Sequence, residues 1–216
     1  MSEATVQVYK EPSLENLLEP GEQVLWTGVP FRGQGLFEPV GQERLIHLSL
    51  LVGTVLMWCS LPFIGAESRF GVRDAYWVYG VVSIAFLAIS CSLAHQRRYV
   101  LSNFLYFVTD ERTILCRRAM NWRLSERLYV VSCPLSTTFP YEVVETRPYP
   151  SIRVGTLLSE DVVQPFGIGI SHPGHSPLWG RITMQVMFDY LEDVEAVRAL
   201  ILQQAAQAEA ALAKRG

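Results

Sequence analysis

The chain has few charged residues, few cysteines and no large excess of one charge. Asp, Glu, Lys and Arg make up 18% of its 216 residues, and the formal net charge is -3. A charged share below the ~25% typical of globular domains argues against a disordered chain and against a highly charged soluble surface. The balance of charge excludes a strongly basic DNA-binding domain. Four cysteines are too few for a disulfide-rich secreted scaffold.

The sequence also lacks the motifs of common catalytic sites. It has no G-x-x-x-x-G-K-[ST] phosphate-binding loop, no G-x-S-x-G nucleophile elbow and no H-E-x-x-H zinc motif. The acidic pairs 160–161 and 192–193 stand in a predicted turn and at a predicted helix start, where solvation and capping explain them. The sequence therefore predicts neither an enzyme nor a bound cofactor. An enzyme is the alternative, and it would require a buried polar pocket with strongly shifted pKa values.

Hydrophobic residues are concentrated in two runs, 45–65 and 75–94, which contain no Asp, Glu, Lys or Arg. Each matches the roughly 20 apolar residues that cross the hydrocarbon core of a bilayer. Two buried core helices are the alternative, but core helices usually keep a polar stripe, which these runs lack. The first run begins too late in the chain for a cleaved signal peptide. The runs therefore predict a transmembrane hairpin that stays in the mature protein.

The charges that flank the two runs predict their orientation. Arg32 and Arg44 precede the hairpin and Arg97 and Arg98 follow it, whereas the connection 66–74 carries two arginines and two acidic residues. The positive-inside rule then places both chain termini in the cytoplasm.

Small residues predict where the two helices of the hairpin contact each other. Ser49 and Gly53 lie in the first run, and Ala88 and Ser92 lie in the second, near the same end of the hairpin. His47 lies close to the cytoplasmic end of the first run. Exposure at the membrane interface explains this histidine better than a proton relay or a metal ligand.

After residue 98 the sequence changes to short segments rich in Val, Tyr, Phe, Thr and Leu, separated by turn signals. This pattern is typical of an antiparallel β-sandwich or a partly open barrel. No segment with helical periodicity separates the strands, which disfavours a parallel α/β sheet. The predicted strands are 99–101, 105–109, 113–117, 127–131, 137–144, 152–157 and 182–188.

One amphipathic helix is predicted at the C-terminus, over residues 191–213. Its apolar residues recur every three or four positions, at Val194, Val197, Ile201, Ala205, Ala208 and Leu212. We expect this stripe to cover one open end of the β domain and the Ala-rich second half to extend past the sheet.

Two short motifs and the order of the elements resemble one protein family. Segment 20–30, PGEQVLWTGVP, is similar to the segment that opens many bacterial membrane-anchored proteins with a pleckstrin-homology-like (PH-like) domain. Segment 106–115, YFVTDERTIL, is similar to their Tyr-x-Leu-Thr-x-x-Arg first hairpin, with Val108 where Leu is usual. Segment 188–197 resembles their last strand running into a helix. The resemblance covers nearly the whole chain.

This resemblance implies a fold class and a three-part organisation. Residues 1–44 are expected to form a cytoplasmic N-terminal segment that carries the first motif, residues 45–94 the transmembrane hairpin, and residues 95–216 a cytoplasmic PH-like domain. The expected fold is a membrane α-helical hairpin plus an α+β, PH-like antiparallel β-sandwich or barrel, capped by the C-terminal helix. The implied location is the bacterial inner membrane, crossed twice.

Five arginines on and around the first strands after the hairpin are candidate contacts for lipid or phosphate. The resemblance implies a phosphate pocket at this place in lipid-binding PH domains. Near an anionic leaflet each arginine could contribute on the order of 1 kcal/mol. Alternatively, these side chains only hold the domain against the membrane. They are Arg112, Arg117, Arg118, Arg123 and Arg127.

Segment 162–181 is rich in Gly and Pro, where the family pattern would have a tighter turn. We expect a loop here, and loops often carry function. His172 and His175, without a nearby Cys, make a poor zinc site, so no metal is predicted. The candidate partner contacts are the aromatic or apolar residues Trp122, Phe166, Ile170 and Trp179.

Together these patterns predict a non-catalytic inner-membrane binding protein that acts as an accessory subunit, scaffold or assembly factor of a larger membrane protein complex. Anchoring to the membrane raises the effective concentration of the β domain at its partner. The expected partners are that complex and the lipid bilayer, with a homo-oligomer left open and no nucleic acid. The alternative function is a sensor of anionic lipid or of the membrane surface, acting through the arginines.

Overall fold

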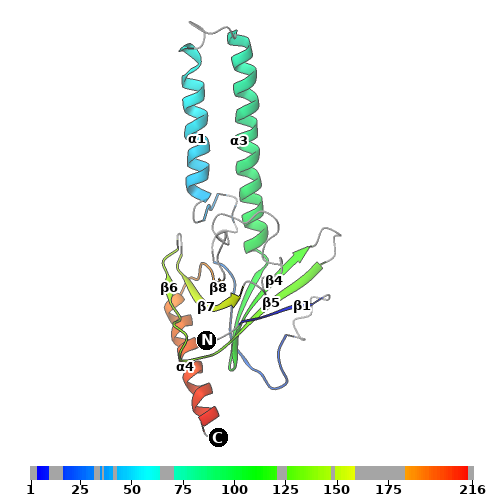
Figure 1. The fold of residues 1–216 in the computed structure, drawn as a ribbon, viewed down its shortest axis with the longest axis vertical. Coiled ribbons are helices and arrows are strands. Elements are labelled where there is room, and N and C mark those ends of the chain that lie inside the picture. The colour runs from blue at the N-terminus through cyan, green and yellow to red at the C-terminus, as the bar shows by residue number, and fades with distance from the viewer. Residues whose placement is uncertain are drawn as a thin grey trace.

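The chain folds into two antiparallel β-sheets, a helix packed on them, and a helical hairpin that extends away from them along the long axis (Figure 1). This computed structural model describes residues 4–9, 17–31, 35, 37–40, 43–63, 71–120, 126–146, 149–158 and 183–213. The protein is therefore an α+β protein with antiparallel sheets and two long apolar helices, as the sequence predicts.

The larger sheet has five strands in the order β1-β5-β4-β3-β2. β1 and β2 precede the hairpin in the sequence, but they pair with β5 and β3, which follow it. The predicted segment 1–44 therefore contributes two strands to the same sheet as the predicted domain 95–216. The strand bounds are β1 (Thr5–Tyr9), β2 (Val24–Gly28), β3 (Phe104–Thr109), β4 (Arg112–Met120) and β5 (Glu126–Pro134).

The smaller sheet has three strands in the order β6-β7-β8, and helix α4 (Val194–Ala213) contacts β6 and β7. The two sheets pack on each other but do not join into a closed barrel. The strand bounds are β6 (Val143–Val144), β7 (Ser151–Leu158) and β8 (Thr183–Phe188).

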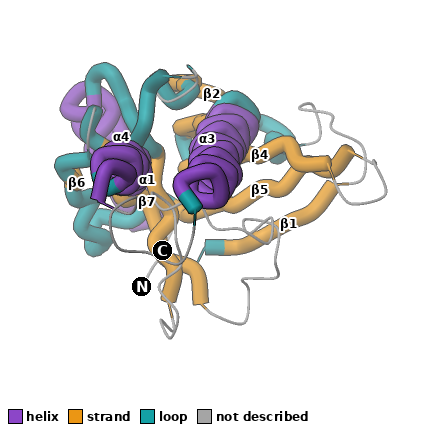
Figure 2. The backbone as a smooth tube through the Cα atoms, turned by 90° about the horizontal axis from the view of Figure 1, so that it is seen from above, coloured by secondary structure: helices purple, strands orange, loops and turns teal. Residues whose placement is uncertain are grey.

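Helices α1 (Glu43–Cys59) and α3 (Val72–Leu101) form the hairpin and lie side by side (Figures 1 and 2). The spans Glu43–Phe63 and Val72–Leu101 are long enough and apolar enough to cross a membrane. In their most apolar windows only 0% and 6% of the residues are buried within the chain. The most apolar windows of the two helices therefore lie outside the core of the β region.

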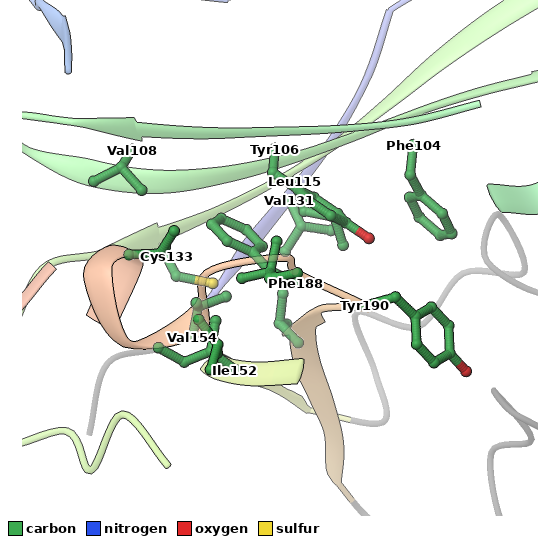
Figure 3. Close-up of a cluster of buried hydrophobic side chains, with 14 of the residues drawn as sticks. Phe104, Tyr106, Val108, Leu115, Val131, Cys133, Ile152, Val154, Phe188 and Tyr190 are labelled. Atoms are coloured by element: carbon green, nitrogen blue, oxygen red, sulfur yellow. The ribbon is translucent and has the colours of Figure 1, made fainter. Parts of the chain in front are cut away.

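The two sheets share one hydrophobic core, with Tyr106 and Phe188 near its centre (Figure 3). Their rings stack with centroids 4.7 Å apart. The Tyr106 hydroxyl accepts a hydrogen bond from the backbone N–H of Asp189 at 3.1 Å, so this buried polar group is satisfied. Helix α4 adds Val194, Val197 and Ile201 to the core, which confirms the predicted apolar stripe over these positions.

Helix α3 continues beyond the predicted run 75–94 and enters the β region directly. Arg97, Val100 and Leu101 are buried, and the two aliphatic residues belong to the core shared by the sheets. β3 begins at Phe104, three residues after the helix ends. The predicted strand 99–101 is therefore wrong, because burial of Val100 and Leu101 against the sheets extends the helix through these residues.

The predicted strand 137–144 is also wrong over most of its length, because only Val143–Val144 pair as β6. Residues 137–139 form a turn in which Phe139 N–H contacts Ser136 O, and the Tyr141 hydroxyl accepts a hydrogen bond from Ser136 N–H. The other five predicted strands are confirmed as β3, β4, β5, β7 and β8, and the predicted C-terminal helix is confirmed as α4, which begins at Val194.

The Trp-x-Gly portion of the first motif has a packing reason. Trp26 and Gly28 lie two residues apart in β2, and the Trp26 indole, which stacks on Phe188, covers Gly28. A Cβ atom at Gly28 would lie 2.1 Å from Cη2 of Trp26. Any side chain at this position would therefore displace the indole from the core.

We expect Gly28→Ala to lower the free energy of unfolding by about 1–3 kcal/mol, because the displaced indole must find a strained position. Thermal unfolding in detergent micelles measures the change. Gly80→Ala is the matched control, since a Cβ at Gly80 in α3 meets no atom within 4 Å. Equal stability of Gly28→Ala and wild type would contradict the packing account.

Candidate functional site

A tight turn in the first motif positions the carboxylate of Glu22. Glu22 N–H donates to Glu19 O at 3.0 Å, and Gly21 has a φ of 94°. Proline in the second position and a glycine with positive φ in the third are typical of a type II turn. Glu19 N–H donates in turn to Oε2 of Glu22 at 2.8 Å, which holds the carboxylate in place.

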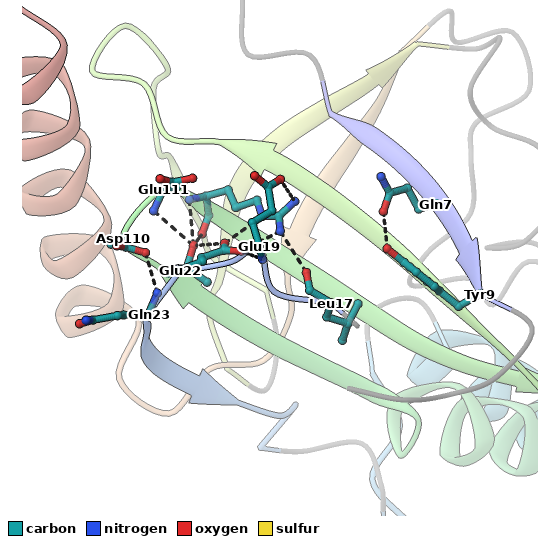
Figure 4. Close-up of polar contacts among 10 residues, drawn as sticks. Gln7, Tyr9, Leu17, Glu19, Glu22, Gln23, Asp110 and Glu111 are labelled. Atoms are coloured by element: carbon teal, nitrogen blue, oxygen red, sulfur yellow. Dashed lines mark hydrogen bonds and ion pairs between the residues drawn. The ribbon is translucent and has the colours of Figure 1, made fainter. Parts of the chain in front are cut away.

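Glu22 binds Arg112 across the turn between β3 and β4 (Figure 4). Arg112 Nε donates to Oε1 at 2.9 Å and Nη2 donates to Oε2 at 2.7 Å, which is bidentate geometry. The Thr109 hydroxyl donates to Oε1 at 2.7 Å, and Arg112 Nη2 also donates to Leu17 O. The two motifs that carry the family resemblance therefore contact each other. We call this contact the Glu22–Arg112 clamp.

The clamp shifts the protonation of both partners. Burial raises the pKa of Glu22, but hydrogen bonds from Arg112, the Glu19 backbone and Thr109 outweigh burial, and the net pKa lies below its usual value. The hydrogen bond to Glu22 raises the pKa of Arg112. Both groups are therefore charged at neutral pH.

A second charged cluster lies where the hairpin meets the β region. Arg97 Nη1, in α3, donates to Oε2 of Glu43, at the start of α1, at 3.1 Å. These side chains are 1% and 0% exposed. Arg97 Nη2 donates to Gly35 O at 2.7 Å, His47 Nε2 lies 3.0 Å from Oε1 of Glu43, and Val40 N–H donates to Glu43 Oε2. We call these five residues the hairpin-base cluster.

The hairpin-base cluster joins the end of α3 to two neighbouring segments that lie more than fifty residues earlier in the chain. It connects the first turn of α1, the last turns of α3, and the segment 35–40 that leads from β2 toward α1. A buried ion pair contributes only when its remaining polar atoms also find partners. The cluster therefore requires all three segments in a single arrangement, and it fixes the hairpin on the β region.

The predicted arginine contacts do not gather on one described surface. Arg112 is held in the clamp, and Arg117 is buried at 1% exposure with its guanidinium 5.7 Å from the centroid of the Phe104 ring. Burial lowers the pKa of Arg117, and Tyr99 and Tyr129 partly offset this. Arg118 is exposed on β4. Arg123 lies outside the described residues. Arg127 lies in β5, where the structure describes its backbone but not its side chain.

The predicted partner contacts Trp122, Phe166, Ile170 and Trp179 all lie outside the described residues, as does the loop 162–181. Their role stays a prediction.

Of the residues predicted to pack the hairpin, Gly53 faces Phe86 of α3, whose ring would lie 3.8 Å from an added Cβ. Ser49, Ala88 and Ser92 are exposed. The half-buried stripe of α3 instead includes Tyr79, Ser83, Phe86 and Ser90.

Polar contacts between the helices lie near the far end of the hairpin. The Trp58 indole N–H donates to Ser83 Oγ at 3.0 Å, and Ser60 Oγ lies 2.9 Å from the Tyr79 hydroxyl. The Trp58 ring also contacts Tyr79 edge to face. Both ends of the hairpin are therefore held by side-chain hydrogen bonds, one set at the base and one toward the tip.

The described residues offer little for catalysis or metal binding. No group of three His, Cys, Asp or Glu side chains that could hold a metal occurs among the described residues. All four cysteines are free thiols, and burial raises the pKa of Cys116 and of Cys133 to about 12. These two thiols stay protonated and are poor nucleophiles.

Comparisons of the chain with protein families, with curated proteins and with solved structures give no match. The function is therefore inferred from the two clusters and from the surface of the hairpin.

From the sequence, Arg97 was expected only as a flanking charge, and neither Glu22 nor Glu43 was singled out. A signal was present for each cluster. Glu43 and Arg97 stand just outside the membrane ends of the two runs on the same predicted side, where opposite charges of a hairpin meet. Glu22 and Arg112 occupy defined positions in the two motifs that resemble one family.

We expect Glu22→Gln to lower the free energy of unfolding by about 2 kcal/mol at neutral pH, because a charged hydrogen-bonded partner of Arg112 is lost. Since folding lowers the pKa of Glu22, its contribution is complete above the unfolded value, 4.5, and is lost as the pH falls through the folded value. The difference in the free energy of unfolding between wild type and variant should therefore become smaller as the pH falls from 5 to 3. Unfolding in micelles across this range measures it, with the exposed Glu145→Gln as control. A difference in the free energy of unfolding that does not change with pH would contradict a stabilising role of the clamp.

We expect Glu43→Gln to destabilise the junction by about 3–5 kcal/mol, because the buried Arg97 charge loses its hydrogen-bonded carboxylate. Hydrogen exchange of the Val100 and Leu101 amides measures local opening there. The double variant Glu43→Leu/Arg97→Met should open less than Glu43→Gln, since it removes both charges. Arg98→Met, at an exposed neighbouring position, is the control. Unchanged exchange in Glu43→Gln would show that the ion pair does not hold the junction.

Proposed function

We propose that this chain is a two-pass protein of the bacterial inner membrane, with both termini in the cytoplasm and a PH-like β domain. In this proposal it acts as a non-catalytic accessory subunit, scaffold or assembly factor of a larger membrane protein complex. The β domain recognises the complex, and the hairpin confines it to the membrane surface.

The observation that carries the proposal is an apolar hairpin, exposed along its length, that is joined to a folded domain at a buried ion pair. Large apolar side chains point away from the chain on both helices, including Leu48, Leu51, Val55, Val81, Ile84 and Leu87. Such a surface requires lipid or another membrane protein as its environment. The hairpin-base cluster and the direct passage from α3 into β3 orient the β domain relative to that environment.

A fixed orientation favours a binding role. A domain held in one orientation at the membrane loses less rotational freedom when it binds a membrane-embedded partner. Weak contacts then suffice for binding, because anchoring raises the effective concentration of the β domain at its partner. The exposed apolar surface of the hairpin is available for a second set of contacts in the membrane.

Separate observations support the PH-like fold and the non-catalytic role. Two packed antiparallel sheets followed by one amphipathic helix suit a PH-like domain, to which β1 and β2 would be additions. A non-catalytic role is supported by the missing sequence motifs and by the structural use of Glu22, Glu43, Arg97 and Arg112 in ion pairs.

Purification from native membranes in a mild detergent, followed by mass spectrometry of what co-migrates, tests this function. We expect recovery with a larger membrane complex at fixed stoichiometry. Arg118→Gln removes the exposed arginine of β4 and should leave this recovery unchanged. Purification of wild type alone, as a monomer or homo-oligomer, would overturn the stable-subunit form of the proposal.

A further inference from the structure

A groove of about 560 Å³ runs between strand β2 and the first half of helix α4. Trp26, Val29 and Phe31 line one side, and Ala196, Val197 and Leu200 line the other. Val29 and Phe31 are roughly half exposed although they are apolar. The groove therefore offers an apolar floor open to solvent, which the two charged clusters do not occupy.

β2 is an edge strand of the five-stranded sheet. Its one described pairing is with β3, and no described strand lies on its outer side. In an antiparallel sheet, alternate residues of an edge strand direct their backbone N–H and C=O groups outward. An extended peptide can pair with such an edge and place every second side chain into an adjacent groove.

The charge at the rim selects the kind of peptide. Glu192 and Asp193 line the groove at the start of α4, and no Lys or Arg is among its described lining residues. Asp193 Oδ1 accepts a hydrogen bond from Ala196 N–H and caps the helix, while the Glu192 side chain is exposed. These carboxylates favour a Lys or Arg in the ligand and disfavour anionic lipid headgroups.

The position of the groove suggests where such a peptide comes from. The N-terminal half of α4 is the half nearer the hairpin, and the C-terminus lies at the opposite end of the molecule (Figure 1). If the hairpin spans the membrane, the half of α4 that lines the groove is the half nearer the bilayer. Cytoplasmic segments next to transmembrane helices are enriched in Lys and Arg.

We propose that this groove binds an extended segment of a partner membrane protein, with alternating apolar and Lys or Arg residues, that lies next to one of the partner's transmembrane helices. The segment pairs with the free edge of β2, places alternate apolar side chains between Trp26 and Ala196, and brings the cationic side chain at its end to Glu192 at the rim. The inference rests on the proposed function, for which it names the partner segment.

Direct binding to full-length protein in maltoside micelles is the first test, read by fluorescence anisotropy of labelled nine-residue peptides. A peptide of alternating Lys and Val should bind. The same peptide with Glu in place of Lys should bind at least tenfold more weakly, because of the carboxylates. A Lys/Val peptide that is N-methylated at every residue should also bind at least tenfold more weakly, because it has no backbone N–H to donate to β2. No binding of the Lys/Val peptide, or equal binding of all three, would overturn the proposal.

Two pairs of variants locate the site. Ala196→Trp fills the groove and should weaken Lys/Val binding at least tenfold, whereas Ala199→Trp, exposed on α4 outside the groove, should change it less than twofold. Glu192→Lys should weaken binding, and Glu195→Lys, also outside the groove lining, should not. Thermal unfolding checks that all four variants fold. Equal binding by Ala196→Trp and Ala199→Trp would place the peptide elsewhere and overturn the proposal.

Recovery of the membrane complex with the same variants separates the groove from the proposed function. Loss of the complex with Ala196→Trp but not with Ala199→Trp supports both. A complex recovered equally with both variants overturns the groove proposal and leaves the proposed function intact. If wild type binds the peptide but purifies without a complex, the proposed function fails and the peptide site stands. A dimer of this chain that Ala196→Trp abolishes would make a second copy the occupant and overturn the proposal.

Discussion

Burying a charged side chain costs several kcal/mol unless an opposite charge and further hydrogen bonds compensate for it. For Arg97 the carboxylate of Glu43 supplies the opposite charge, and the carbonyl of Gly35 accepts a further hydrogen bond. The position of α1, the end of α3 and the path from β2 to α1 are therefore linked. This constraint joins the hairpin and the β domain into a single body, on which the proposed function depends.

The direct passage from α3 into β3 also joins the hairpin to the β domain. A flexible linker would let a domain tumble beneath its membrane anchor. Here Val100 and Leu101 belong to the core, and Phe104 already belongs to the sheet. The Glu22–Arg112 clamp makes a second connection within the β domain, because it holds the turn before β2 on the turn between β3 and β4. The strands on either side of the hairpin are thus fixed to each other.

Local sequence patterns predicted most of the individual elements but not their connections. The apolar runs, five strands and the stripe of α4 follow from periodicity and composition, which act over a few residues. The end of α3 was missed because residues 99–101 are strand-like by composition, and only their burial against the sheets keeps them helical. The pairing of β1 and β2 with β5 and β3 spans the whole hairpin, so no local pattern indicates it.

The polar contacts were hard to predict for the same reason. Glu22 and Arg112 lie ninety residues apart, and Arg97 and Glu43 fifty-four. Arg112 and Arg117 were candidate lipid or phosphate contacts because of their clustering in the sequence, and the fold places one in the clamp and the other in the interior. A charge near the membrane can anchor a domain from outside or hold it together from within, and sequence spacing does not distinguish these roles.

The central claim is that the hairpin and the β domain form one rigid body, and an interspin distance distribution tests it most directly. Spin labels at Leu87→Cys in α3 and Gln185→Cys in β8, both exposed positions, are measured in nanodiscs with Cys59 and Cys91 replaced by Ser. The account predicts one narrow peak, as narrow as that from labels at Gln185→Cys and Gln203→Cys within the β domain. A broad or multiple distribution from the first pair would contradict it.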